Sequence, residues 1–89
     1  MELKQLLTRA YELSGSDIFI VPGAKVTCKV KGDMVPLSEE IVRPAETEQL
    51  VREAYDLAHR DIARLQDEGD DDFSFAVAGL SRFRCNAYF

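Results

Sequence analysis

The feature that most constrains the fold is a strict alternation of side chains at the end of the sequence. Over residues 82–89, apolar positions alternate with polar ones: Phe83, Cys85, Ala87 and Phe89 against Arg82, Arg84, Asn86 and Tyr88. A period of two residues is typical of a β-strand that buries one face. Arg82 and Arg84 would stand roughly 7 Å apart on the other face, from the rise per residue of a strand. Such a pair of guanidinium groups suits a phosphate or the carboxylates of a partner.

Helical and strand-like patterns follow one another along the rest of the chain. Residues 2–13 and the segment that begins at Pro44 have apolar residues at helical spacing. The second helical pattern runs on through Ile62 and Leu65 to Gly69, either as one bent helix or after a break near His59. Residues 16–21, 25–31, 34–37 and 72–78 are predicted strands, with a two-residue turn at 32–33, a loop at 38–43 and a turn at 78–81.

This order of elements predicts an α+β fold. Helices and strands do not alternate strictly, so a doubly wound parallel sheet is disfavoured and a mostly antiparallel sheet with helices packed against it is expected. The strands 72–78 and 82–89 are expected to form an antiparallel hairpin. The last strand reaches the final residue without a stop signal, which suggests a piece of a longer protein. Its outer edge is then expected to lack a neighbouring strand and to be open to another chain.

Size and charge narrow the classes of function. The chain has 89 residues, enough for one small domain, and a net charge of −5, which disfavours general nucleic-acid binding. No apolar run is long enough for a transmembrane helix, and no signal-peptide pattern is present. Cys28 and Cys85 both fall on apolar strand faces, which favours buried, reduced thiols in a cytoplasmic protein.

Several polar residues have both a functional and a structural interpretation. Asp17 suits a turn cap better than a metal ligand or base. The lysines at positions 25, 29 and 31 suit a solvated sheet face or a protected edge better than a phosphate patch. The acidic run 67–72 fails the calcium-loop pattern, which leaves a solvated connector or a docking site for a basic partner. His59 has no second ligand at metal spacing and is expected at the surface.

The residues that carry out nucleotide hydrolysis in known enzymes are not found in this sequence. There is no phosphate-binding G-x-x-x-x-G-K-(S/T) loop and no cysteine–histidine pair suited to nucleophilic catalysis. The residues alone therefore predict a binding or interaction module and no stand-alone enzyme.

Three stretches in order resemble a known family. Residues 79–88, GLSRFRCNAY, resemble the G-x-x-R-F-R-x-N-x-(F/Y) signature of the type IV pilus retraction (twitching motility) ATPases, the PilT-like branch of the type II/IV secretion ATPases. Residues 14–20, SGSDIFI, resemble the family's G-(A/S)-S-D-(L/I)-H-(L/I) opening, with Phe19 where the family often has histidine. Residues 69–75, GDDDFSF, resemble its acidic lead into D-F-S-(F/Y). Because Phe19 and the segment around Lys25 depart from the pattern, a retraction ATPase, a diverged relative and an assembly ATPase all stay open.

The resemblance implies a small PAS-like N-terminal domain that precedes a RecA-like motor domain in a hexameric ATPase. ATP and Mg²⁺ would bind in the motor domain of the full-length protein, and the isolated domain would need no cofactor. The domain would contact its own and the neighbouring motor domain and, through them, pilus components at the inner face of the membrane, without inserting into it. The second arginine of the signature falls on Arg84 and would approach the ATP phosphates like an arginine finger, with Arg82 as the weaker candidate.

Other interpretations of the same residues stay open. Arg84 can instead form a structural salt bridge, for instance with the acidic residues 70–72. The chain can also be a stand-alone PAS-like sensor or protein-interaction adaptor, and a closed apolar pocket in the core would support that interpretation. It can thirdly be an oligomerisation module that uses an exposed strand edge.

Overall fold

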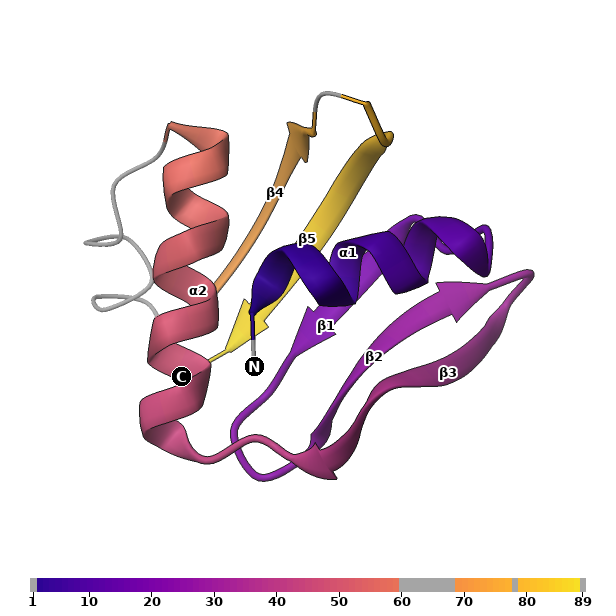
Figure 1. The fold of residues 1–89 in the computed structure, drawn as a ribbon. Helices are drawn as coiled ribbons and strands as arrows, with labels where there is room; N and C mark the ends of the chain where they lie inside the picture. The colour runs from indigo at the N-terminus through magenta and orange to yellow at the C-terminus, as the bar shows by residue number, and fades with distance from the viewer. Residues whose placement is uncertain (1, 60–68, 78, 89) are drawn as a thin grey trace.

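The computed structural model describes residues 2–59, 69–77 and 79–88. Two helices lie on one face of a five-stranded sheet with the strand order β3-β2-β1-β5-β4 (Figure 1). Three of the four strand pairings are antiparallel, and the pairing of β1 with β5 is parallel. The predicted α+β fold with a mostly antiparallel sheet is therefore confirmed.

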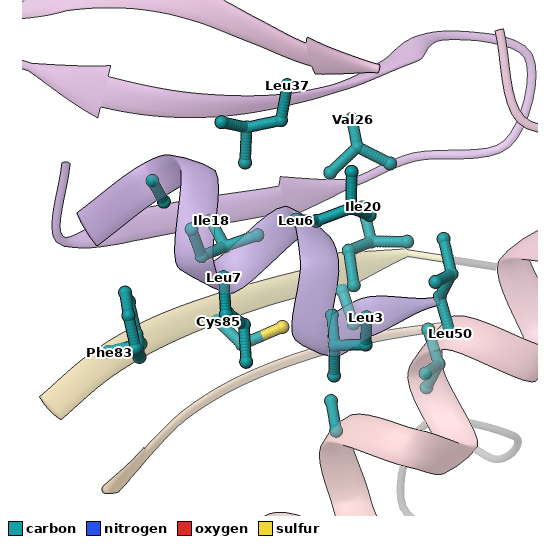
Figure 2. Close-up of a cluster of buried hydrophobic side chains, with 14 of the residues drawn as sticks. Leu3, Leu6, Leu7, Ile18, Ile20, Val26, Leu37, Leu50, Phe83 and Cys85 are labelled. Carbon is teal, nitrogen blue, oxygen red and sulfur yellow. The ribbon is translucent and has the colours of Figure 1, made fainter. Parts of the chain in front are cut away.

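Helix α1 spans Leu3–Glu12 and buries the stripe that its spacing predicts. Leu3, Leu6, Leu7 and Ala10 are buried against the sheet, as Figure 2 shows for the three leucines. The helix ends where the Gly15 N–H donates to the Ala10 carbonyl at 2.8 Å, with Ser14 in the left-handed region at φ 62°. Gly15 is thus needed for space, because a Cβ atom there would lie 2.8 Å from the Cys28 sulfur.

Strands β1 (Asp17–Ile20) and β2 (Lys25–Val30) confirm two predicted strands. The turn between β2 and β3 was predicted one residue too late: Val30 pairs with Asp33, so the turn residues are Lys31 and Gly32. Both have positive φ, 51° and 88°, as a tight hairpin turn of the primed type requires. Because a lysine seldom adopts that conformation, the sequence pointed to the glycine and the aspartate instead.

Strand β3 spans Asp33–Ile41, so the predicted strand end at residue 37 was wrong, and of the predicted loop 38–43 only residues 42 and 43 lie outside strand and helix. Pro36 is tolerated because β3 lies at the edge of the sheet, where a missing N–H breaks no ladder on the outer side. The register shifts between Lys25 and Thr27, and Ser38 is buried at this irregularity. Its hydroxyl accepts a hydrogen bond from the Val26 N–H at 3.0 Å and donates one to the Glu40 carbonyl at 2.8 Å.

Helix α2 spans Pro44–Ala58 and has the predicted proline in its first turn. The buried residues of this helix are Thr47, Leu50, Val51, Ala54 and Tyr55, whereas Leu57, an apolar residue of the same helix, is 39% exposed. His59 ends the helix in the left-handed conformation, at φ 54°, and is exposed as predicted. The predicted continuation through Ile62 and Leu65 lies outside the described residues.

Strands β4 (Asp70–Ala76) and β5 (Arg82–Tyr88) form the predicted antiparallel hairpin. The expectation that the last strand has an open edge was wrong. Strand β5 lies inside the sheet, paired with β4 on one side and with β1 on the other, and the edges are β3 and β4. Turn residues between consecutive strands could not predict this position of β5, because the β1–β5 pairing joins strands that are far apart in the sequence.

The core lies between the helices and one face of the sheet. Figure 2 shows Ile18, Ile20, Val26, Phe83 and Cys85 facing the α1 leucines and Leu50 of α2. Cys28 and Cys85 are buried free thiols, as predicted. No helix within the described ranges is long and apolar enough to cross a membrane.

Candidate functional site

The candidate site is the row of polar side chains on β5. Phe83, Cys85 and Ala87 point into the core, so the intervening side chains lie on the sheet face that the helices leave uncovered. This face is called the open face below. The strand is hydrogen-bonded along both sides, so its backbone holds these side chains at fixed spacing.

Arg84 lies between two carboxylates on neighbouring strands. Asp17 of β1 is its direct neighbour on one side. On the other side Ser74 of β4 is directly opposite, and Asp72 is one diagonal step away. The Arg84 Nε donates to Asp72 Oδ1 at 2.9 Å, and Nη2 donates to Asp72 Oδ2. The pair is two-pronged, with side chains 59% and 46% exposed.

This pairing changes the protonation equilibria of both groups. The hydrogen bond with Arg84, followed by the attraction of its charge, holds the pKa of Asp72 below its usual value. The same hydrogen bond and the charge of Asp72, with a smaller contribution from Asp17, raise the pKa of Arg84. Both groups are therefore ionised throughout the physiological range.

Arg82 has a different partner. Its Nη2 donates to the Ser74 hydroxyl at 2.9 Å. The hydrogen-bond acceptor of Arg82 is therefore a neutral group, whereas that of Arg84 is a carboxylate. Both arginines lean toward the edge strand β4. The salt bridge between Arg84 and the acidic run, which the sequence left open as the alternative to a phosphate contact, is present with Asp72 as the partner. The expected connector is wrong for residues 70–72 of the acidic run, because they belong to strand β4, with Asp71 buried and Asp70 and Asp72 exposed; residues 67 and 68 lie outside the described residues.

The other polar residues selected from the sequence surround this row. Asp17, predicted as a turn cap, is the direct neighbour of Lys29 as well as of Arg84. Lys25 and Lys29 are exposed on the open face, on the far side of β1. The order Lys29, Asp17, Arg84 across three strands alternates in charge. The lysines and arginines therefore do not form one continuous basic patch.

The sequence reasoning missed an apolar hollow on the open face. It has a volume of about 630 Å³, is open to solvent, and is lined by Phe19, Val21, Pro22, Ala24, Lys25, Thr27, Met34 and Tyr88. Met34 is 51% exposed and Tyr88 is 40% exposed. Alternation could have placed Phe19 and Tyr88 on this face, but only the parallel β1–β5 register brings them to the same region.

Metal binding has no support in the part of the chain that the structure describes. Among those residues, no group of three or more histidine, cysteine, aspartate or glutamate side chains could hold a metal ion.

Proteins similar to this chain are found among pilus ATPases and motors. No family model matches the chain. The chain is 30% identical over 90 aligned residues to the type IV pilus ATPase PilU of Pseudomonas aeruginosa, an alignment that covers 100% of the chain and 23% of PilU. The crystal structure of the pilus retraction motor PilT with bound ADP matches with a TM-score of 0.71 and 30% identity, over 99% of the chain and 25% of PilT.

In the part of the chain that the structure describes, two helices on one face of a mixed five-stranded sheet form a small α+β fold. The chain spans about a quarter of the length of both relatives. Because both matches extend over essentially all of it, the chain is similar over its whole length to part of a type IV pilus ATPase, which confirms the resemblance seen in the three sequence stretches.

Proposed function

We propose that this domain closes over nucleotide in a hexameric ATPase that powers type IV pilus retraction, and that Arg84 contacts the ATP phosphates. In this proposal the chain is the N-terminal domain of a longer cytoplasmic protein whose RecA-like motor domain binds ATP and Mg²⁺. The domain itself is non-catalytic. It contacts its own and a neighbouring motor domain, and through them the inner-membrane components of the pilus machinery.

The observation that carries the proposal is the position of Arg84. Its guanidinium group is exposed on an interior strand, so the group is accessible while its backbone is held on both sides. A guanidinium fork held this way suits the equatorial oxygens of a phosphoryl group. Arg82 lies on the same face two residues earlier and is the second candidate. The relatives add support, since one is a pilus ATPase and the other a retraction motor solved with ADP.

The open face also supports contacts between domains. Exposed Met34 and Tyr88 border the apolar hollow, and apolar side chains gathered on one face commonly mark a protein interaction surface. Lys25 and Lys29 lie at and beside this region and can pair with acidic groups of a partner. Arg84 on the same face would then come near whatever nucleotide the partner domain holds.

The deciding experiment uses the full-length parent protein. We expect Arg84→Ala to lower ATP turnover by at least about tenfold with little change in nucleotide affinity, because a phosphate contact made in the transition state affects kcat. The matched control is Arg52→Ala. Arg52 also forms an exposed ion pair, in which Nε and Nη2 both donate to Glu48 Oε1 on helix α2, but it lies away from the open face. Unchanged turnover in Arg84→Ala would reject the proposal.

The hollow favours a second candidate function, an adaptor that binds a partner or small ligand without a motor domain, over a PAS-like sensor. It is open to solvent and lies on the sheet surface, whereas a PAS-like sensor holds its ligand in an enclosed core. A parent gene without a phosphate-binding loop beyond this domain, together with a co-purifying ligand lost on Met34→Glu, would favour this function.

A further inference from the structure

We propose that Asp72 competes with phosphate for Arg84, so that this ion pair must break before the guanidinium group can bind a phosphate in the two-pronged mode. The inference rests on the proposed function, because it adds a regulatory residue to the same site. Binding of phosphate would replace one partner of the guanidinium group by another, with no covalent change.

The geometry of the pair supports competition. Asp72 engages both Nε and Nη2 of Arg84. These two donors form one edge of the guanidinium fork, and an edge of this kind is what binds a carboxylate or a phosphate in the two-pronged mode. Because Asp72 is reached diagonally, past Ser74, the pair also draws the guanidinium across the edge strand β4. A phosphate that binds this edge must displace Asp72.

The pair is exposed enough to exchange. Both side chains are about half exposed, and ion pairs in such positions contribute little net free energy because water and salt screen them. A pyrophosphate or triphosphate group carries more negative charge than one carboxylate. It can therefore take over the arginine without any change in the fold of the sheet.

The neighbouring arginine provides an internal contrast. The side-chain contact of Arg82 is with the Ser74 hydroxyl, a neutral acceptor that competes weakly with phosphate. Asp70 provides the matched control on the acid side. It lies on the same strand and face as Asp72 and is exposed, but its direct neighbour across the ladder is Tyr88.

The experiment follows the Arg84 Nε–H signal by ¹⁵N NMR while inorganic pyrophosphate is added to the 89-residue chain. Wild type, Asp72→Asn and Asp70→Asn are compared, each checked for an unchanged amide spectrum. We expect Asp72→Asn to bind pyrophosphate about two- to fivefold more tightly than wild type, from the range for exposed pairs. Asp70→Asn removes the same charge and is expected to change the affinity less.

Two results would overturn the inference. One is an Asp72→Asn affinity no tighter than that of Asp70→Asn, and the other is an Arg84 signal that responds to pyrophosphate in none of the three proteins. ATP turnover of Arg84→Ala in the parent protein shows whether only the competition between Asp72 and phosphate is rejected or the proposed function as well. If turnover falls while Asp72→Asn behaves like Asp70→Asn, only the competition is rejected. If turnover is unchanged, the proposed function fails by itself.

Discussion

The hydroxyl group of Tyr55 on helix α2 donates a hydrogen bond of 2.9 Å to the carboxylate of Asp71 on strand β4. Both residues are buried, and the Tyr55 ring stacks on Phe73 with a centroid distance of 4.6 Å. Asp71 also accepts the Asp72 N–H at 3.0 Å. A buried polar contact thus ties the second helix to the edge strand that carries the partner of Arg84.

Replacement of Tyr55 by phenylalanine is expected to destabilise the domain by about 1–3 kcal/mol, because a buried carboxylate loses a hydrogen-bond donor. The ring and its stacking on Phe73 are retained. The free energy of unfolding in urea is the measurement, and Tyr11→Phe is the control, since Tyr11 is 51% exposed. Equal stabilities of the two variants would show that the hydrogen bond contributes nothing.

Replacement of Gly15 by alanine is expected to destabilise the domain by about 1–3 kcal/mol through overpacking. The added Cβ would lie 2.8 Å from the Cys28 Sγ and 3.2 Å from its Cβ. A double-mutant cycle with Cys28→Ala is the measurement, because removal of the sulfur should recover part of the loss. Additive effects of the two changes would contradict a direct clash.

Cys85 is expected to resist thiol reagents in the folded domain. Burial, followed by the nearby charges of Asp71 and Asp72, raises the pKa of its thiol to about 12. Burial raises the pKa of the Cys28 thiol as well. At pH 8 both thiols should react with a disulfide reagent only after unfolding in guanidinium chloride. Rapid modification under native conditions would show that the β5 strand opens locally.

The raised pKa of Cys85 also has a consequence for stability at high pH. The folded domain holds the thiol proton more tightly than the unfolded chain, whose cysteine pKa is near its ordinary value. The stabilising contribution is complete below that ordinary value and is lost as pH rises toward about 12. Wild type should therefore lose stability relative to Cys85→Ala over this range. Parallel pH profiles for the two proteins would contradict the assignment.

The carboxyl group of Asp72 is expected to titrate below its ordinary range, and Arg84→Gln should bring its pKa back up. Because this pKa is lowered on folding, the stabilising contribution is complete above the unfolded value and is lost as pH falls through the folded one. A ¹³C NMR titration of the side chain measures this directly. Arg82→Gln is the control, since Arg82 contacts Ser74. An equal upward change in both variants would mean that general charge, and not the pair, holds the pKa down.

Local pattern was enough to predict most of the elements. The alternation over residues 82–88 predicted which side chains of β5 are buried and that both arginines lie on the opposite face, since the period of a strand requires no tertiary information. The leucine stripe of α1 and the proline at the start of α2 are equally local. The three sequence motifs then indicated the resemblance to type IV pilus ATPases.

Predictions failed where geometry depends on distant residues or on rare conformations. The end of β3 was misplaced because Ser38 replaces a ladder contact at a register shift, which propensity cannot show. Lys31 was passed over as a turn residue because its positive φ is uncommon for lysine. The sequence indicated that an ion-pair partner of Arg84 would lie among residues 70–72, but only the register between β4 and β5 shows that Asp72 is the partner.

The parallel pairing of β1 with β5 bears on how the domain folds. Asp17 pairs with Arg84, so almost the whole sequence must form a closed loop before this ladder exists. Contacts of such long separation form slowly. The strands β1, β2 and β3 can meet early, but the inner side of β1 then stays unpaired until the last strand is available. A growing or partly unfolded chain therefore exposes this side of β1 as a template for other strands, and a change that slows the docking of β5 should appear first as aggregation.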